Sequence, residues 1–167
     1  MSAAGKNEAF VIVRRFAAPR GVVWDCYTKE EHLKNWWGPK GFKMLKCSMD
    51  FRIGGVFHFG MESPAGLVMW GKWVFHMIEK PHLLANSVSF SDADCGVTQH
   101  PFAPVWPPAT YAETTFEDLG GETEIRLVWE PGEATEAEIE AFRDAHAGMN
   151  AGCEGTFSQL DAYLKTL

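Results

Sequence analysis

The most constraining feature of the sequence is a long amphipathic pattern near its C-terminal end. Thr135 and Glu138 have the spacing of a capping box, in which two side chains satisfy free backbone N–H groups where a helix begins. Beyond them, apolar side chains recur at steps of three and four, which predicts one helix of about 30 residues. This stripe consists of Ile139, Phe142, His146, Met149, Cys153, Phe157, Leu160 and Leu164. A helix with so long an apolar face needs an equally long apolar surface to pack against.

Three glycines, Gly148, Gly152 and Gly155, lie inside this expected helix. Each of them costs about 1 kcal/mol of helix stability relative to alanine. A helix tolerates such residues where another backbone or a ligand must come close, so we expect a close neighbour along this stretch.

The preceding chain predicts the surface that this helix covers. Residues 8–16 are rich in Val, Ile and Phe and predict a strand, and two short helices are expected at about 19–27 and 29–37, before Gly38 and Pro39. Six further strands are expected at residues 42–50, 56–61, 67–78, 83–90, 110–117 and 122–130. An antiparallel sheet of this length curls, and only the C-terminal helix is long enough to cover its concave face.

These elements predict an α+β fold. A curved antiparallel sheet of six or seven strands wraps around one long C-terminal helix, and two short helices follow the first strand. The length of 167 residues suits one domain, which we place at residues 8–167, with residues 1–7 as a flexible N-terminal segment. An exposed edge of such a sheet would permit a homodimer.

Composition and charge exclude several classes of partner. The net charge is −7, so the chain repels nucleic-acid phosphates, and no stretch has the pattern of a membrane span or a signal peptide. The four cysteines form no Cys-x-x-Cys pair, which predicts reduced thiols in a cytoplasmic protein. His58 and His76 lie on neighbouring expected strands, but both are expected on the outward face without a carboxylate or cysteine nearby, so no metal site is predicted.

Aromatic residues make up 13% of the chain, which is more than a core strictly needs. In the expected strand at 67–78, the odd positions from Met69 to Met77 form the cleaner apolar face, so we expect them to point inward. Phe57 and Phe59 share one face of the strand before it. Ordinary core packing and an aromatic-lined pocket are both consistent with this cluster.

Residues 91–108 form the one long irregular stretch of the sequence. Its four prolines fix φ and lack an N–H donor, so the stretch cannot be a central strand. It also contains His100 and Trp106. The stretch is either a surface loop stiffened by proline or a lid over the mouth of a pocket.

Several short motifs resemble one known superfamily. They are residues 15–20 (RFAAPR), 36–42 (WWGPKGF), 50–55 (DFRIGG), 69–72 (MWGK), 98–101 (TQHP), 146–149 (HAGM) and 155–160 (GTFSQL). The chain resembles the helix-grip superfamily of START domains, the birch pollen allergen and polyketide cyclases, and within it the proteins related to the activator of the heat-shock chaperone ATPase. The resemblance implies a helix-grip fold with a cavity between sheet and helix, and it favours the lid.

The chain departs from the family pattern at three places. Tyr27 stands where the family usually has Trp, His76 and Met77 where many relatives carry Arg and Glu, and Cys153 where an aromatic residue is usual. We expect these positions to face or border the cavity, so the ligand preference of relatives does not transfer directly.

The leading hypothesis is a non-catalytic protein, without a cofactor, that binds a small hydrophobic molecule, aromatic or polycyclic. Asn86 and His146 would supply hydrogen bonds among otherwise apolar neighbours. The expected ligand-binding residues are Trp37, Phe57, Phe59, Met69, Trp73, Phe75, Asn86, His100, Trp106, His146, Met149 and Cys153.

Two other functions remain open at this point. A cyclase, dehydratase or hydrolase acting on a polyketide-like substrate would use His146 as general acid or base and Asn86 to orient the substrate. A histidine on an apolar helix face is more often a core residue, and the inner faces carry no convincing pair of carboxylates. The third possibility, which the resemblance implies, is a co-chaperone that stimulates a heat-shock ATPase.

Overall fold

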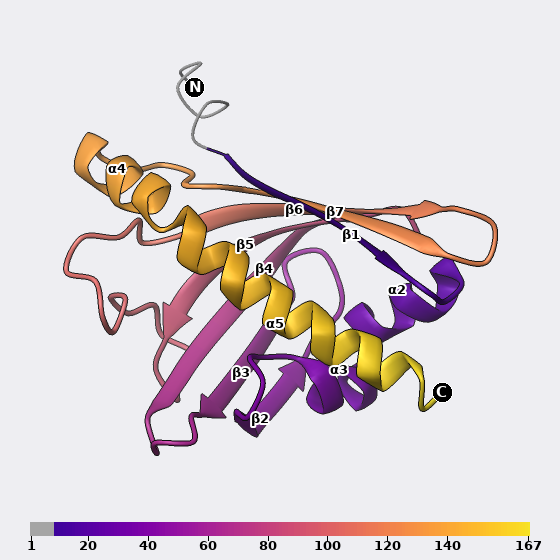
Figure 1. Ribbon diagram of the computed structural model, residues 1–167. Coiled ribbons are helices and arrows are strands. Elements are labelled where there is room, and N and C mark those ends of the chain that lie inside the picture. The colour runs from indigo at the N-terminus through magenta and orange to yellow at the C-terminus, as the bar shows by residue number, and fades with distance from the viewer. Residues whose placement is uncertain (1–8) are drawn as a thin grey trace.

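A computed structural model describes residues 9–167 of the chain (Figure 1). Seven antiparallel strands form one sheet in the order β1-β7-β6-β5-β4-β3-β2. The strands are β1 (Phe10–Phe16), β2 (Lys43–Met49), β3 (Val56–Glu62), β4 (Val68–Glu79), β5 (Leu83–Ser91), β6 (Thr110–Asp118) and β7 (Thr123–Glu130). The sheet curves, and α5 (His146–Leu164) crosses its concave face (Figure 1). The predicted α+β helix-grip fold is confirmed, while residues 1–7, expected to be flexible, lie outside the described residues.

Two short helices, α2 (Arg20–Thr28) and α3 (Glu30–Trp36), follow β1 as the sequence predicts. Pro19 caps the start of α2 with a φ of −60°, the value that its ring imposes. Trp24 and Trp36 are almost completely buried, and the ring of Trp24 lies 5.2 Å from that of Phe116 on β6. The two helices lie near the C-terminal end of α5, so they fill that end of the curved sheet (Figure 1).

The C-terminal helix differs from its prediction. Thr135 and Glu138 form the capping box, with both of its hydrogen bonds present. One continuous helix is nevertheless wrong, because the chain forms α4 (Glu136–Asp144) and α5 with a separation at Ala145. In Figure 1, α4 is offset from the axis of α5.

Long-range packing accounts for this separation, since neither proline nor glycine occurs there. Phe142 on α4 is fully buried, and its ring lies 5.6 Å from Trp106 and 6.1 Å from Trp129. Contacts of this kind are invisible to helical periodicity, which sees only spacing along the chain. Within residues 9–167, no helix is both long and apolar enough to cross a lipid bilayer.

A bulge in β4 changes the face on which its last side chains lie. Trp73 and Phe75 point inward and are buried, as the alternation predicts. The pairing of β4 with β5 then shifts register between Phe75 and Met77, and Met77 is 42% exposed. Ile78 packs against the core in its place. The inward orientation expected for Met77 is therefore wrong, because an extra residue in one strand shifts the side chains that follow it.

Helix α5 meets the sheet closely at only one of its ends. Near its C-terminus, Phe157 and Leu160 are 4% and 0% exposed, and the ring of Phe157 lies 5.6 Å from that of Phe16 on β1. Near its N-terminus, Met149 and Cys153 are only half-buried. The two apolar surfaces therefore separate toward the start of α5, and a space opens between them.

Candidate ligand-binding cavity

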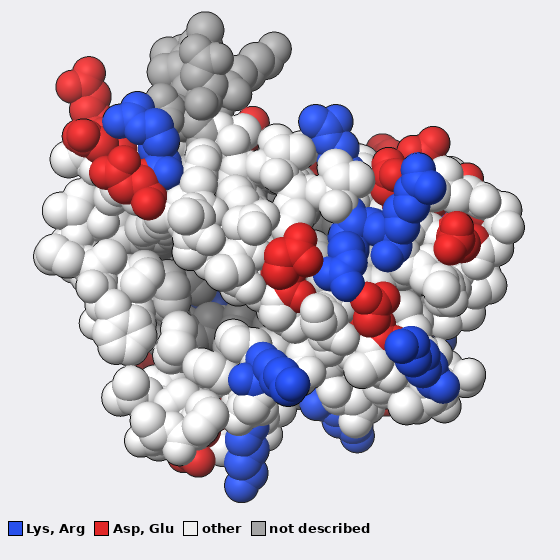
Figure 2. Space-filling model, viewed as in Figure 1, with Lys and Arg blue, Asp and Glu red and all other residues white. Residues whose placement is uncertain are grey.

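A cavity of about 670 Å³ occupies the space between the concave face of the sheet and the first half of α5. Strands β3 to β7 form its floor. Figure 2 shows a hollow below the N-terminal half of α5, bordered mainly by uncharged residues. Protein interiors rarely contain voids larger than a water molecule, whereas volumes of about 300–1,000 Å³ are typical of small-molecule sites. The cavity is therefore large enough to hold an organic molecule.

Aromatic side chains from distant parts of the chain form one wall. The ring of Trp37, which follows α3, lies 4.9 Å from Trp73 and 5.7 Å from Phe59, with the planes nearly perpendicular. Edge-to-face packing of this kind holds large flat rings in place. The wall therefore presents rigid apolar surface to the cavity.

Two glycines allow this wall to close. A methyl group at Gly71 would lie 2.5 Å from the ring of Phe59, so only glycine admits that ring over β4. Gly38, directly after Trp37, has a φ of +108° and lies against the sulfur of Met61. These close approaches explain glycines in the 36–42 and 69–72 motifs.

The glycines of α5 have a different structural role from Gly38 and Gly71. Gly148 and Gly152 line the cavity beside Met149 and Cys153, and apart from the backbone of α5 itself, no atom of residues 9–167 lies within 4 Å of a Cβ built at either position. The expected approach of another backbone is therefore wrong here. Instead, the missing side chains leave space in the cavity that larger residues would fill.

The loop of residues 92–109 lies beside the cavity and supplies His100 and Trp106 to its lining. Nδ1 of His100 accepts hydrogen bonds from the backbone N–H groups of Phe102 and Ala103, at 3.0 and 3.1 Å. The His100 ring lies 4.5 Å from Phe90 and 5.1 Å from Trp106. Burial lowers the pKa of His100, because the charged form is the less well solvated. The neutral His100 ring therefore stabilises the turn that the loop makes at residues 100–103.

His58 holds the base of the same loop. The sequence predicts His58 on the outward face of the sheet, and there the start of the loop covers it, so that it is only 4% exposed. Its Nε2 lies 3.0 Å from the carbonyl oxygen of Asp92, and its ring stacks on Trp70 at 5.3 Å. His76 is exposed on its strand. Residues 9–167 contain no group of three or more His, Cys, Asp or Glu side chains placed to hold a metal ion.

The structure brings most of the predicted site residues together. Nine of them line the cavity: Trp37, Phe59, Met69, Trp73, Asn86, His100, Trp106, Met149 and Cys153. Phe57 and Phe75 do not, because they are fully buried in the core. Their strands and faces were predicted correctly, but alternation along a strand does not reveal how deep a side chain lies.

His146 lies outside the cavity lining. It begins α5, and its ring packs 5.6 Å from Phe10 and 5.4 Å from Phe142. The separation of α4 from α5 places it between these rings, which helical periodicity did not foresee. The general acid or base role considered for His146 therefore lacks the access to the cavity that it requires.

Of the departures from the family pattern, Tyr27 and Cys153 line the cavity, whereas His76 and Met77 are exposed and do not. Burial raises the pKa of the Cys153 thiol to about 11. Because the thiolate is the nucleophilic form, this thiol is inert near neutral pH. All four cysteines are free thiols.

Sequence reasoning missed the part of the floor that β6 and β7 supply. Thr110, Ala112 and Thr114 on β6 and Leu127 and Trp129 on β7 line the cavity. The sequence signal for this face is the alternation of Ala112, Thr114 and Phe116 with Glu113, Thr115 and Glu117. The signal is weak, because small and polar side chains mark an inward face less clearly than aromatic ones.

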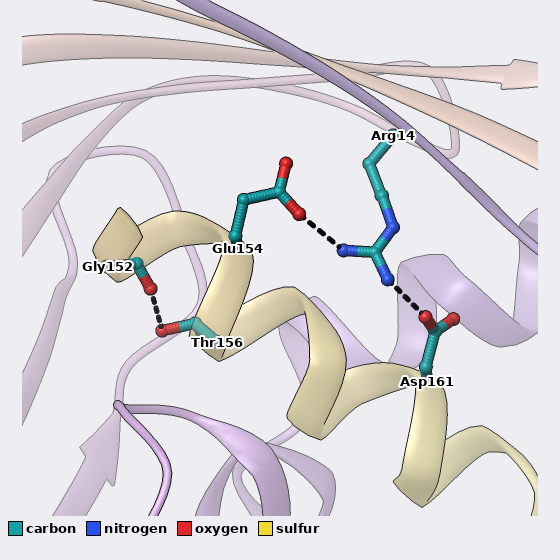
Figure 3. Close-up of polar contacts among 5 residues, drawn as sticks. All are labelled: Arg14, Gly152, Glu154, Thr156 and Asp161. Carbon is teal, nitrogen blue, oxygen red and sulfur yellow. Dashed lines mark hydrogen bonds and ion pairs between the residues drawn. The ribbon is translucent and has the colours of Figure 1, made fainter. Parts of the chain in front are cut away.

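Polar contacts hold the C-terminal half of α5 against its neighbours. Arg14 on β1 donates hydrogen bonds to Glu154 and Asp161, which lie about two turns apart along α5 (Figure 3). The hydroxyl of Tyr163 lies 2.6 Å from Nδ1 of His32 on α3. The half of α5 that covers the core is thus fixed at both sides, while the first half spans the cavity.

The fold and the cavity together define a helix-grip protein, a class known for binding hydrophobic ligands between its sheet and its long helix. The chain belongs to the family described as "Activator of Hsp90 ATPase homolog 1-like protein", whose profile matches residues 17–165. A comparison with curated proteins found no match.

Solved bacterial structures share this fold. A protein from Mycobacterium smegmatis is 24% identical with a TM-score of 0.78, and the match covers 95% of this chain and 91% of that one. A protein from Arthrobacter aurescens is 26% identical with a TM-score of 0.76, covering 97% and 88%. A protein from Rhodobacter sphaeroides is 22% identical with a TM-score of 0.76, covering 100% and 97%.

Proposed function

We propose that this protein binds a small hydrophobic molecule, aromatic or polycyclic, in the cavity between the sheet and α5. The observation that carries the proposal is the cavity itself, about 670 Å³ in volume, between two surfaces that would otherwise pack together. Protein atoms do not fill this space, so its apolar lining lacks the dispersion contacts that a filled core makes. A bound molecule restores those contacts, so the fold gains stability from its ligand.

The chemistry of the lining supports binding rather than catalysis. Cys153 is held as a neutral thiol, and His146 packs between Phe10 and Phe142. Asp144 is the only acidic residue among the lining residues of the described chain, so no pair of carboxylates faces the cavity. Flat aromatic walls instead offer large contact area at small entropic cost.

A space-filling substitution tests the proposal. In Gly152→Leu, the new side chain enters the cavity, where no atom lies within 4 Å of its Cβ. The variant is expected to fold, because leucine favours helices more than glycine does. We expect it to lose the rise in melting temperature that pyrene, a flat polycyclic probe, gives the wild-type protein. Native mass spectrometry would detect the bound probe directly.

Gly155→Leu is the matched control. Gly155 lies on the same helix, is equally free of close neighbours, and does not line the cavity. This variant should keep the shift caused by pyrene. If Gly152→Leu binds pyrene as the wild type does, or if the wild type shows no binding, the proposed site is wrong.

The family description favours a second candidate, stimulation of a heat-shock ATPase. It would use the outer surface rather than the cavity. An ATPase assay with the purified chaperone tests it, and unchanged turnover at saturating protein would exclude it.

The proposal also includes a cellular location, the cytoplasm, and an oligomeric state, a homodimer. Free thiols fit a reducing cytoplasm, and fractionation of cells tests that location.

Strands β1 and β2 are the two edges of the sheet, and either could pair with its copy in a homodimer. Light scattering of the purified protein gives the oligomeric state.

A further inference from the structure

Two buried polar side chains on the cavity wall leave hydrogen-bonding capacity that residues 9–167 do not use, and a third lining residue, Trp37, holds its Nε1 buried without a partner in that part of the chain. Asn86 on β5 and Thr114 on β6 are 2% and 7% exposed. Asn86 pairs across the sheet with Ala112, and Thr114 lies two residues further along β6. The two side chains therefore share the concave face as diagonal neighbours, with Cα atoms about 7–8 Å apart.

Their hydrogen bonding sets these two side chains apart from Thr110, a third polar residue of the same wall. Thr110 Oγ1 accepts from Nε1 of Trp129 at 2.7 Å and donates to the carbonyl oxygen of Val88 at 3.3 Å. Within residues 9–167, no hydrogen bond from the side chain of Thr114 is found, and Asn86 makes one, from Nδ2 to the carbonyl oxygen of Ser87 at 3.3 Å. Whichever way its amide is turned, one polar atom of Asn86 stays without a protein partner.

The described residues that line the cavity carry no positive charge. Among the described residues that line it, none is Lys or Arg, and the only charged side chain is Asp144, a carboxylate on α4. An anion that entered would lose its hydration without gaining an opposite charge, and Asp144 would repel it. Carboxylate ligands such as fatty acids therefore do not fit this lining.

Building on the hydrophobic binding proposed above, we infer that the ligand is uncharged and carries a hydroxyl group that Asn86 and Thr114 hold on the cavity floor. The ligand hydroxyl donates to Oδ1 of Asn86 and accepts a hydrogen bond from the hydroxyl of Thr114. Asn86 and Thr114 have hydrogen-bonding capacity that residues 9–167 do not use, and a ligand hydroxyl between them would take it up. The aromatic walls then surround its ring system. Phenols and polycyclic alcohols have this combination of groups.

Three probes of one skeleton test the inference: pyrene, 1-hydroxypyrene and 1-pyrenecarboxylate. Their fluorescence reports binding to the full-length protein at pH 7. We expect 1-hydroxypyrene to bind about three- to tenfold more tightly than pyrene, the range for one or two neutral hydrogen bonds. The carboxylate should bind most weakly of the three.

Thr114→Val removes the hydroxyl and keeps the shape of the side chain. It should abolish the preference for 1-hydroxypyrene over pyrene, so that the two probes bind the variant equally well. Thr115→Val is the matched control, because Thr115 is the next residue of β6 and is exposed on the opposite face. Asn86→Leu provides a second test with the same expected loss.

The outcomes separate this inference from the function on which it rests. If pyrene binds and the hydroxyl adds nothing, or if Thr114→Val weakens all three probes equally, the polar site is wrong while hydrophobic binding stands. Tightest binding of the carboxylate would also overturn the inference. If none of the probes binds the wild-type protein, both proposals fall.

Discussion

Arg14 on β1 forms an ion pair with Asp161 on α5, although 147 residues separate them in the chain. The same guanidinium also pairs with Glu154 at 3.0 Å (Figure 3). The arginine side chain is 24% exposed. This relationship joins an edge strand of the sheet to the half of α5 that packs on the core, so it stabilises that packing.

Replacing Arg14 by Gln is expected to lower the free energy of unfolding by about 1 kcal/mol, because it removes two partly exposed ion pairs. Urea denaturation at low salt measures the change, and added salt should reduce it. Arg15→Gln is the control. Arg15 is 68% exposed and pairs only with Glu124, so its loss should stay below about 0.5 kcal/mol. Equal losses for the two variants would contradict the role given to Arg14.

Phe57 and Phe59 allow the core and the cavity wall to be told apart. Phe57 is completely buried, so Phe57→Ala leaves a void and is expected to cost about 3–5 kcal/mol of unfolding free energy. Phe59 lines an existing cavity, so Phe59→Ala should cost less and should weaken pyrene binding more. Denaturant titration and probe fluorescence give the two readouts. A larger stability loss for Phe59→Ala would contradict this assignment.

His100 predicts a pH dependence of stability. Burial lowers the pKa of His100 in the folded protein below its ordinary value of 6.5. The stability that the neutral ring contributes is therefore fully present above pH 6.5. As the pH falls below that value, the unfolded chain binds a proton at His100 before the folded chain does, and stability is lost. Protonation would also remove the acceptor of the Phe102 and Ala103 N–H groups.

His100→Asn isolates this effect, since the amide oxygen can accept the same hydrogen bonds but does not titrate. Melting temperatures from pH 5 to pH 8 should fall less steeply for the variant than for the wild type on the acidic side. Because the other histidines are unchanged, the difference between the two curves reports His100. Identical curves would show that this residue has the same pKa in both states.

Cys153 is expected to resist alkylation. With a pKa of about 11 in the folded protein, on the order of one thiol in a thousand is ionised at pH 8. Iodoacetamide labelling followed by mass spectrometry should modify Cys153 slowly, and much faster in urea, where the thiol has an ordinary pKa of 9.0. A bound pyrene should slow the reaction further. Rapid labelling of the folded protein would contradict the burial of this thiol.

The sequence by itself determined the order of the strands, the two short helices after the first strand, and most of the residues that face inward. Alternation predicts the inward faces of β3 and β4, the capping box marks where α4 begins, and the motif glycines at 38 and 71 lie where close packing requires them. These are local properties, because strand pleat, helix capping and φ depend on residues near one another in the chain.

Only the tertiary structure decided which inward side chains border empty space. Phe57 and Phe59 share one face, yet the first fills the core and the second lines the cavity. Likewise, the packing of Phe142 against Trp106 and Trp129 separates α4 from α5 and places His146 outside the cavity. Depth and helix direction depend on contacts between residues far apart in the chain, and periodicity carries no information about how closely two surfaces meet.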